Sequence, residues 1–334
     1  MTATYTQVAE HAGWLDLTDW GLIRTIGADR RRFLQGQTTN DLRPLVEGTG
    51  VYTAFCTPTG QLLSDGYVLE AEGGYLLVLP AETWGDISAR LSEAIILDDV
   101  TLMPLQEGLG LLSLQGGAVD EVLEELGLTP PPEAPLAHHT QIWQAAELRL
   151  IRNDRTGFGG VDVCVPYEVM EEFQTALIAT ECLRIDDALA EVLRYEAGVP
   201  QVGVDTTERT LAAELGEPFV RTHISYTKGC YVGQEVLMRI HARGHTNRTW
   251  VPMRIEGERL PQRGAALHAP DRPDAGWLTG AVHSPALEGA ILAWGFVRNE
   301  YAPAGSVLQV HSEPSAQAVV LAAAPRPAKQ LLHI

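Results

Sequence analysis

The chain is organised around one stretch, Lys228-Gly229-Cys230-Tyr231-Val232-Gly233-Gln234-Glu235, which places a single thiol between a lysine and two glycines. Apolar residues at helical spacing run from Val232 to Ile240, and this predicts that a helix follows the thiol. Cys230 therefore lies at or just before a helix N-terminus, where free backbone N–H groups and the helix dipole favour an anion. Lys228 adds a positive charge, and the glycines allow a tight turn. Two interpretations stay open: Cys230 is a reactive or ligand-facing thiolate, or it is a small buried residue at a turn.

Length and composition set the class of protein. The chain has 334 residues, which is too many for one ordinary core, so two or three domains are expected. Hydrophobic residues make up 45% and charged residues 20%, as is typical of a soluble globular protein. The formal net charge is −19, and because phosphate contacts need a basic surface, direct nucleic-acid binding is not expected.

The cysteines and the N-terminal sequence are used to predict the cellular compartment of the protein. The four cysteines are far apart and form no Cys-x-x-Cys pair: Cys56, Cys164, Cys182 and Cys230. Reduced thiols in a cytoplasmic protein are the simplest interpretation. We expect no signal peptide and no membrane partner, because no basic region precedes an apolar run and no apolar run has the length of a membrane span. His241 and His245 are four residues apart, but Gly244 ends the helix between them, so no metal site is predicted.

Positive charge is concentrated in one part of this acidic chain, between Arg221 and Arg254, where Glu235 is the only acidic residue. The basic residues there are Arg221, Lys228, Arg239, Arg243, Arg248 and Arg254. Such a segment either meets a local anionic partner or pairs with the acidic remainder of the chain.

The order of the expected elements indicates an α+β fold. Strands are predicted at 21–27, 52–80 as a meander, 109–114, 142–151 and 161–165, and helices at 29–37, 82–97, 119–126, 167–180 and 185–198. Strand, helix, strands and helix thus occur twice, which predicts two similar α+β units with antiparallel sheets. From Arg248 onward, short strands between Gly and Pro turns predict a small barrel or a jelly-roll-like sandwich. The tail, 325–334, is expected to be partly ordered at best.

Asp65 is a candidate site residue because it alternates onto one strand face with Leu63 and Tyr67. A carboxylate between apolar neighbours must be paired, protonated or ligand-facing, since burying it unpaired is costly. The alternative is a charge on an edge strand or a local turn partner. Gln37 continues a buried stripe in the same way, although on pattern alone its amide belongs to a solvated helix end.

Glu196 is a second inward-facing acid. It continues the apolar stripe of the helix at 185–198 into the last turn. There it either holds a ligand that offers several N–H donors or captures a neighbouring arginine such as Arg184 or Arg194.

Four segments, taken in chain order, resemble the YgfZ family, the folate-binding relatives of the glycine cleavage T-protein (GcvT, aminomethyltransferase). The octapeptide is similar to the K-G-C-Y-x-G-Q-E signature of that family and is highly specific. The others are Phe33 to Asp41, Pro58 to Asp65 and Arg194 to Pro200, which resemble F-L-Q-G-Q-x-T-x-D, P-x-G-x-x-x-x-D and R-x-E-x-G-x-P segments. The likeness covers nearly the whole chain.

The resemblance implies a three-domain ring of two ferredoxin-like α+β domains, partly interleaved, and a C-terminal β-barrel. The implied boundaries are 1–105, 106–245 with the octapeptide, 246–325 for the barrel and 326–334 for a tail. Tetrahydrofolate or a one-carbon derivative would bind in the central channel. The implied role is assembly or repair of iron–sulfur enzymes, including tRNA-modifying ones, with iron–sulfur proteins or assembly factors as partners.

The resemblance also implies roles for residues. In T-protein relatives the glutamate of the R-x-E-A-G segment contacts the pterin, which carries over to Glu196, and a carboxylate of a G-G-x-x-D-D hairpin assists the chemistry at the folate nitrogens. Here that hairpin reads Ser64-Asp65, and the T-protein has no cysteine at the position of Cys230; both departures favour the YgfZ family. The expected catalytic residues are Cys230, Lys228 and Asp65. The expected cofactor-binding residues are Glu196, Tyr195, Asp65, Gln35, Gln37, Tyr231 and Gln234.

Three functions follow as hypotheses. The first is a folate-dependent iron–sulfur assembly or repair factor, in which Cys230 faces the channel as the working thiol. The second is a one-carbon transferase in which Asp65 transfers a proton at the folate nitrogen. The third is a non-catalytic folate-binding scaffold with a structural Cys230. In each, the anionic glutamate tail of folate would suit the basic stretch between Arg221 and Arg254.

Overall fold

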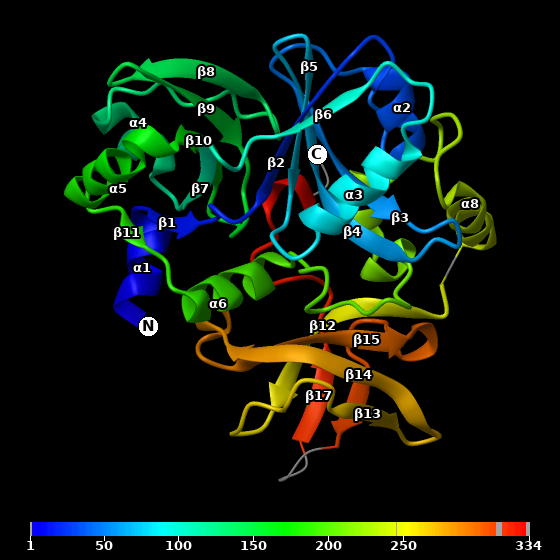
Figure 1. The fold of residues 1–334 in the computed structure, drawn as a ribbon. Coiled ribbons are helices and arrows are strands. Elements are labelled where there is room, and N and C mark those ends of the chain that lie inside the picture. The colour runs from blue at the N-terminus through cyan, green and yellow to red at the C-terminus, as the bar shows by residue number, and fades with distance from the viewer. Residues whose placement is uncertain (1, 245, 312–315, 332–334) are drawn as a thin grey trace.

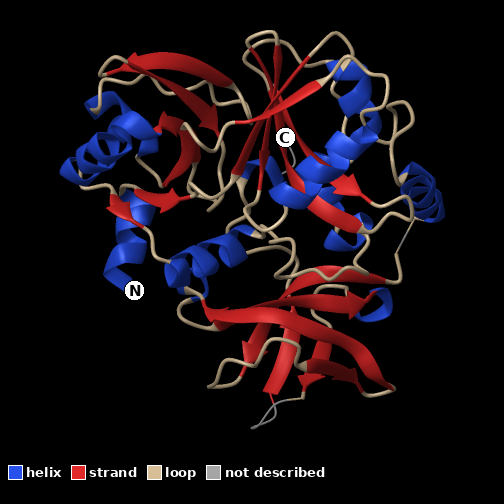
Figure 2. Ribbon diagram, in the orientation of Figure 1, coloured by secondary structure: helices blue, strands red, loops and turns tan. Residues whose placement is uncertain are grey.

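The structure is a computed structural model that describes residues 2–244, 246–311 and 316–331. Three lobes surround a centre (Figure 1): a five-stranded sheet with helices, a six-stranded sheet with helices, and a closed six-stranded barrel. Figure 2 shows that the two upper lobes mix helices and strands, whereas the lower lobe is built almost entirely of strands. The expected α+β class, with two ferredoxin-like units and a C-terminal β-barrel, is confirmed.

The first lobe holds the sheet β3-β4-β5-β2-β6. Its strands are β2 (Gly21–Ile26), β3 (Gly50–Cys56), β4 (Leu62–Ala71), β5 (Gly74–Leu79) and β6 (Thr101–Pro104), and its helices are α2 (Arg30–Gln37) and α3 (Trp84–Ala94). Both helices pack on one face, because Phe33 of α2 and Leu91 of α3 are buried against strand residues such as Ile23 and Leu77. The opposite face of the sheet is thereby left to meet the other lobe and the centre.

The second lobe holds the sheet β11-β1-β7-β10-β9-β8. Its strands are β1 (Gly13–Asp16), β7 (Leu109–Gln115), β8 (His138–Trp143), β9 (Ala146–Arg152), β10 (Gly160–Pro166) and β11 (Leu183–Arg184), with helices α1 (Thr2–Glu10), α4 (Val119–Glu125) and α5 (Met170–Ala179). Strand β1 pairs with β7 and β11, which buries Trp14 in this lobe. The N-terminal strand therefore belongs to the second lobe and corrects the continuous first region 1–105.

The segment after α6 (Asp187–Ala197) returns to the first lobe and carries α7 (Glu217–His223) and α8 (Gln234–Arg243). The backbone N–H of Leu62 donates to the carbonyl of Thr210 at 2.8 Å, and the Thr39 hydroxyl donates to the carbonyl of His223 at 2.7 Å. The octapeptide, expected in the region 106–245, is thus interleaved with the first lobe, and α8 lies at its outer edge (Figure 1).

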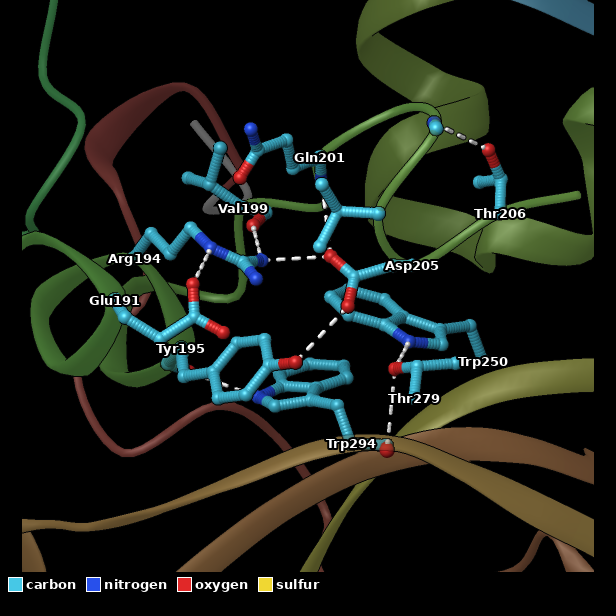
Figure 3. A network of polar contacts seen from close by, with 12 residues as sticks. Glu191, Arg194, Tyr195, Val199, Gln201, Asp205, Thr206, Trp250, Thr279 and Trp294 are labelled. Atoms are coloured by element: carbon cyan, nitrogen blue, oxygen red, sulfur yellow. Dashed lines mark hydrogen bonds and ion pairs between the residues drawn. The ribbon is translucent and has the colours of Figure 1, made fainter. Parts of the chain in front are cut away.

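The barrel runs in the order β12-β15-β14-β13-β16-β17. Its strands are β12 (Arg248–Glu256), β13 (Ala266–Ala269), β14 (Arg272–His283), β15 (Ile291–Arg298), β16 (Val307–Val310) and β17 (Ala316–Val320). Helix α6 joins the barrel to the upper lobes. Trp294 donates its indole N–H to the carbonyl of Tyr195 at 2.9 Å, and stacks on Trp250 with ring centroids 3.9 Å apart (Figure 3).

The end of the chain returns to the centre of the molecule (Figure 1). The backbone N–H groups of Arg326 and Ala328 donate to the carbonyls of Glu196 and Ala197 at 2.8 and 3.0 Å, and Ala328 is fully buried. The tail, expected to be partly ordered at best, is thus packed against the protein as far as Leu331, and the rest of that expectation lies outside the described residues. In the described parts of the chain, every helix is too short or too polar to cross a membrane.

Candidate functional site

A pocket lies where both α+β lobes, α7 and the C-terminal segment meet. Its cavity volume is about 60 Å³, and it opens to solvent. Strand β4 contributes Asp65, the loop after β9 contributes Asn153 and Arg155, and the C-terminal segment contributes Gln330 and Leu331. Because its walls come from distant parts of the chain, this pocket exists only in the assembled ring.

Asp65 is the acidic residue in the lining of this pocket. Among the described residues, no other side chain forms a hydrogen bond or ion pair with its carboxylate. Burial raises the pKa of Asp65 from the ordinary 3.8 to about 6. Its own backbone N–H and the positive charge of Arg155 lower the pKa, but by less than burial raises it. Of the three states expected from sequence, a paired carboxylate is not found among the described residues, and Asp65 lines the pocket.

Five flat rings form much of the remaining lining of the pocket. They belong to Trp20, Tyr52, Tyr67, Phe219 and His223. Tyr52 meets Tyr67 edge to face with ring centroids 6.2 Å apart, and Phe219 stacks on His223 with centroids 4.0 Å apart. An aromatic wall with a few convergent polar groups suits a flat heteroaromatic ligand.

A buried polar network holds this wall in place. Asp162, which is fully buried, accepts hydrogen bonds from the Tyr67 hydroxyl at 2.8 Å, the Asn153 amide at 2.8 Å and the Arg155 guanidinium at 2.6 Å. The Tyr52 hydroxyl donates to the Asn153 side chain at 2.8 Å. Because each ring carrying a hydroxyl is fixed by its partner, the pocket is preorganised.

The network was not predicted, although one signal for it is present. Asp162 interrupts an apolar strand between Val161 and Val163, where a buried carboxylate needs partners. Asn153 and Arg155 follow a strand in a polar turn and carry no comparable signal, because polar turns are ordinary surface features.

The octapeptide joins α8 to the first lobe. Lys228 is buried, and its ammonium donates to the backbone carbonyls of Thr38 and Asn40 at 2.7 and 2.6 Å. Burial lowers its pKa to about 7. Gly233 has φ 88°, and a Cβ there would lie 2.8 Å from the carbonyl oxygen of Thr57. Lys228 and Gly233 thus fasten the turn to the end of α2 and to the β3–β4 hairpin.

Cys230 is exposed and precedes α8 by several residues, since the helix begins at Gln234. It does not line the pocket around Asp65, although a thiol facing the central space was expected. The neighbouring Tyr231 is 7% exposed, and its hydroxyl has no hydrogen-bond partner among the described residues. Neither Tyr231 nor Gln234 lines the pocket.

Glu196 also lies outside the pocket. One carboxylate oxygen accepts from the Ser284 hydroxyl at 2.5 Å and the Ala286 N–H at 2.9 Å, and the other accepts from the Tyr5 hydroxyl at 2.5 Å and Arg326 at 2.7 Å. Capture of an arginine is therefore the observed role, with Arg326 of the tail in place of the neighbours considered from sequence.

The remaining residues that were predicted to bind the cofactor also lie outside the pocket around Asp65. Tyr195 is fully buried and donates its hydroxyl to Asp205 at 3.0 Å (Figure 3). The Gln35 amide bridges Asp41 and the N–H of Leu42, both at 2.8 Å. Gln37 is partly exposed at the end of α2. Of the residues expected to hold the cofactor, only Asp65 lines this pocket.

The basic stretch is largely neutralised within the chain. Its ion pairs are Arg221–Glu217, Arg239–Glu235, Arg248–Glu214 and Arg254–Glu256. The structure thus supports pairing with the acidic remainder rather than an unpaired anion-binding surface.

Comparison with solved structures places the three-lobed ring among known folds. The glycine cleavage system aminomethyltransferase T from Bartonella henselae superimposes with a TM-score of 0.87, over 98% of this chain and 90% of that one, at 20% identity. The molecule therefore has the aminomethyltransferase fold.

The family is shown by sequence. The model of the GCVT N-terminal domain matches residues 1–221, and the chain belongs to this family. It is 27% identical over 331 residues to an aminomethyltransferase of Chlorobium chlorochromatii, covering 97% of this chain and 89% of that protein. It is 28% identical over 312 residues to an aminomethyltransferase of Bacillus velezensis, covering 91% and 83%.

Proposed function

We propose that this chain binds tetrahydrofolate, or a one-carbon derivative of it, in the pocket around Asp65, and acts as a folate-dependent one-carbon transferase. The observation that carries this is the Asp65 carboxylate, which has no side-chain partner in the described parts of the chain and lies in an aromatic-walled pocket at the centre of the ring. A pterin is flat and presents N–H donors along its edge, which suits both features. The relatives named aminomethyltransferase support the same class.

Asp65 is the group suited to the chemistry. A carboxyl group with a pKa of about 6 exchanges a proton near neutral pH, as general acid–base catalysis at a folate nitrogen requires. The adjacent Ser64 is buried, and its hydroxyl lies 2.7 Å from the Thr83 hydroxyl. Asp65 therefore does the proton transfer without a second acid from the hairpin.

Calorimetric titration of tetrahydrofolate into the wild type, Asp65→Asn and Asp86→Asn tests the site. Asp86 is exposed on α3 and serves as the matched control. We expect Asp65→Asn to weaken binding at least ~10-fold, since the charged acceptor is lost, and Asp86→Asn to leave it unchanged. Formation of a methylene-type folate from an amine donor, abolished by Asp65→Asn, would establish the transferase. Absence of binding to the wild type would remove folate from the account.

A second candidate is a role in iron–sulfur enzyme assembly or repair, with Cys230 as the working thiol. It is favoured by one observation: among the four cysteines, Cys230 alone is exposed, on a turn held by the buried Lys228. An exposed thiol is accessible to a partner protein. Cys230→Ala is then expected to abolish function in cells while folate binding is retained. Full cellular activity of this variant would rule out the thiol role.

A further inference from the structure

His223 shares the pocket with Asp65 but comes from α7, a different wall. It is 7% exposed, so it is part of the pocket's interior rather than its rim. Its main-chain carbonyl accepts from the Thr39 hydroxyl at 2.7 Å, which ties the end of α7 to the first lobe. The backbone carrying this side chain is therefore fixed.

The hydrogen bonds of the ring determine its tautomer. Nδ1 lies 3.0 Å from the carbonyl oxygen of Phe219, and a carbonyl only accepts, so Nδ1 carries the proton. The Thr222 hydroxyl, 2.7 Å from the same nitrogen, has the carbonyl of Pro218 as its own acceptor at 2.9 Å. Nε2 is consequently without a proton, and the described residues offer it no hydrogen-bond donor.

The orientation of the ring is equally constrained. It stacks on Phe219 at 4.0 Å with an interplanar angle of 8°, and Tyr52 packs against it at 5.5 Å. Since Nδ1 is turned to the helix backbone, the opposite edge with Nε2 is the edge available to the pocket. Burial lowers the pKa of His223 to about 4, so the ring stays neutral near pH 7.

We propose, building on the function proposed above, that His223 is a ligand-recognition residue whose bare Nε2 accepts an N–H hydrogen bond from the bound pterin. Asp65 and His223 then offer two acceptors on two walls of one pocket. The preferred ligand is a reduced pterin that presents N–H donors on both of the edges it turns to these walls. An analogue that lacks one donor leaves a buried acceptor unpaired, and this is the strongest basis for discrimination in such a site.

The test compares His223→Phe with His223→Gln by calorimetric titration of tetrahydrofolate. Phenylalanine keeps a flat ring stacked on Phe219 and removes both nitrogens, whereas glutamine returns an amide acceptor near the position of Nε2. We expect His223→Phe to weaken binding ~10-fold and His223→Gln to stay within about threefold of wild type. Thermal unfolding of each variant separates lost binding from lost folding.

The outcomes separate this inference from the proposed function. If the wild type binds, Asp65→Asn does not, and His223→Phe binds like the wild type, then the role of His223 is overturned and the proposed function stands. If the wild type does not bind tetrahydrofolate, both are overturned. Should His223→Phe fail to fold, ¹⁵N NMR of the wild-type imidazole decides: we expect the Nε2 resonance to shift upfield on adding tetrahydrofolate, and an unchanged resonance contradicts the proposal.

Discussion

The carboxyl group of Asp65 lies in the pocket without a side-chain partner among the described residues, and its folded-state pKa of about 6 exceeds the ordinary 3.8. The folded protein therefore holds this proton to a higher pH than the unfolded chain does. Between about pH 4 and pH 6 the unfolding free energy consequently falls as the pH rises. Above pH 6 the folded state bears the full cost of burying the ionised Asp65 carboxylate. Such a cost is expected where a group is kept for chemistry rather than for stability.

Replacing Asp65 with Asn is therefore expected to stabilise the protein at pH 7.5 by about 1 to 2 kcal/mol, because the unpaired charge is removed. The gain is expected to vanish at pH 4, where the carboxyl group is already protonated in the native state. Denaturant unfolding at both pH values, with Asp86→Asn as the control, measures this. A variant that is less stable than wild type at pH 7.5 would show that Asp65 is paired.

At the residue scale, sequence reasoning located one site residue for a definite reason. Strand alternation placed Asp65 on one strand face, and burial in the real strand β4 alternates from Leu62 to Asp65 before the strand becomes buried throughout. Sequence reasoning also placed Glu196 inward, where the structure buries it, but it did not find the partner Arg326, which is 130 residues away in a tail with no packing signal. His223 and Phe219 lie on α7, a helix too short to show a clear apolar periodicity.

At the scale of elements, the octapeptide connects α8 to the first lobe. The N–H of Val232 donates to the carbonyl of Gly36 at 3.1 Å, and Gly233 packs against the hairpin turn at Thr57. The sequence indicated a tight turn before a helix, and this is what forms. The contacts that fix the turn, from Lys228 to Thr38 and Asn40, could not be predicted from the octapeptide alone.

The two glycines of the octapeptide provide a matched test of this connection. Gly233→Ala is expected to destabilise the protein by about 2 to 4 kcal/mol, since its φ is positive and the new Cβ meets the Thr57 carbonyl. Gly229→Ala is expected to change stability by less than about 0.5 kcal/mol, because nothing lies within 4 Å of a Cβ there. Thermal unfolding measures both. Equal effects of the two substitutions would contradict the close packing of Gly233 against the first lobe.

At the scale of the whole molecule, the C-terminal segment ties the lobes together at the pocket. Arg326 pairs with Glu196 and lies 3.8 Å from the Phe158 ring, and the N–H of Lys329 donates to Asp154 at 2.9 Å. The alternation of elements predicted the two α+β units and the barrel. The exchange of β1 and the return of the tail were not predicted, because both depend on pairing between distant segments that leaves no local pattern.

Arg326→Ala is expected to destabilise the assembled ring by about 2 to 4 kcal/mol, because it leaves the fully buried carboxylate of Glu196 without its cation. Lys329→Ala is the matched control: its pair with Glu133 is exposed, and a loss below about 1 kcal/mol is expected. Urea unfolding distinguishes them. An Arg326→Ala variant as stable as Lys329→Ala would mean that the tail does not hold the ring.

The most direct test of the central claim is a crystal structure of the chain with tetrahydrofolate. We predict the pterin ring in the central pocket, against the aromatic wall, with an N–H group within hydrogen-bonding distance of the Asp65 carboxylate and another facing Nε2 of His223. Folate bound elsewhere on the molecule, with the pocket around Asp65 empty, would contradict the account.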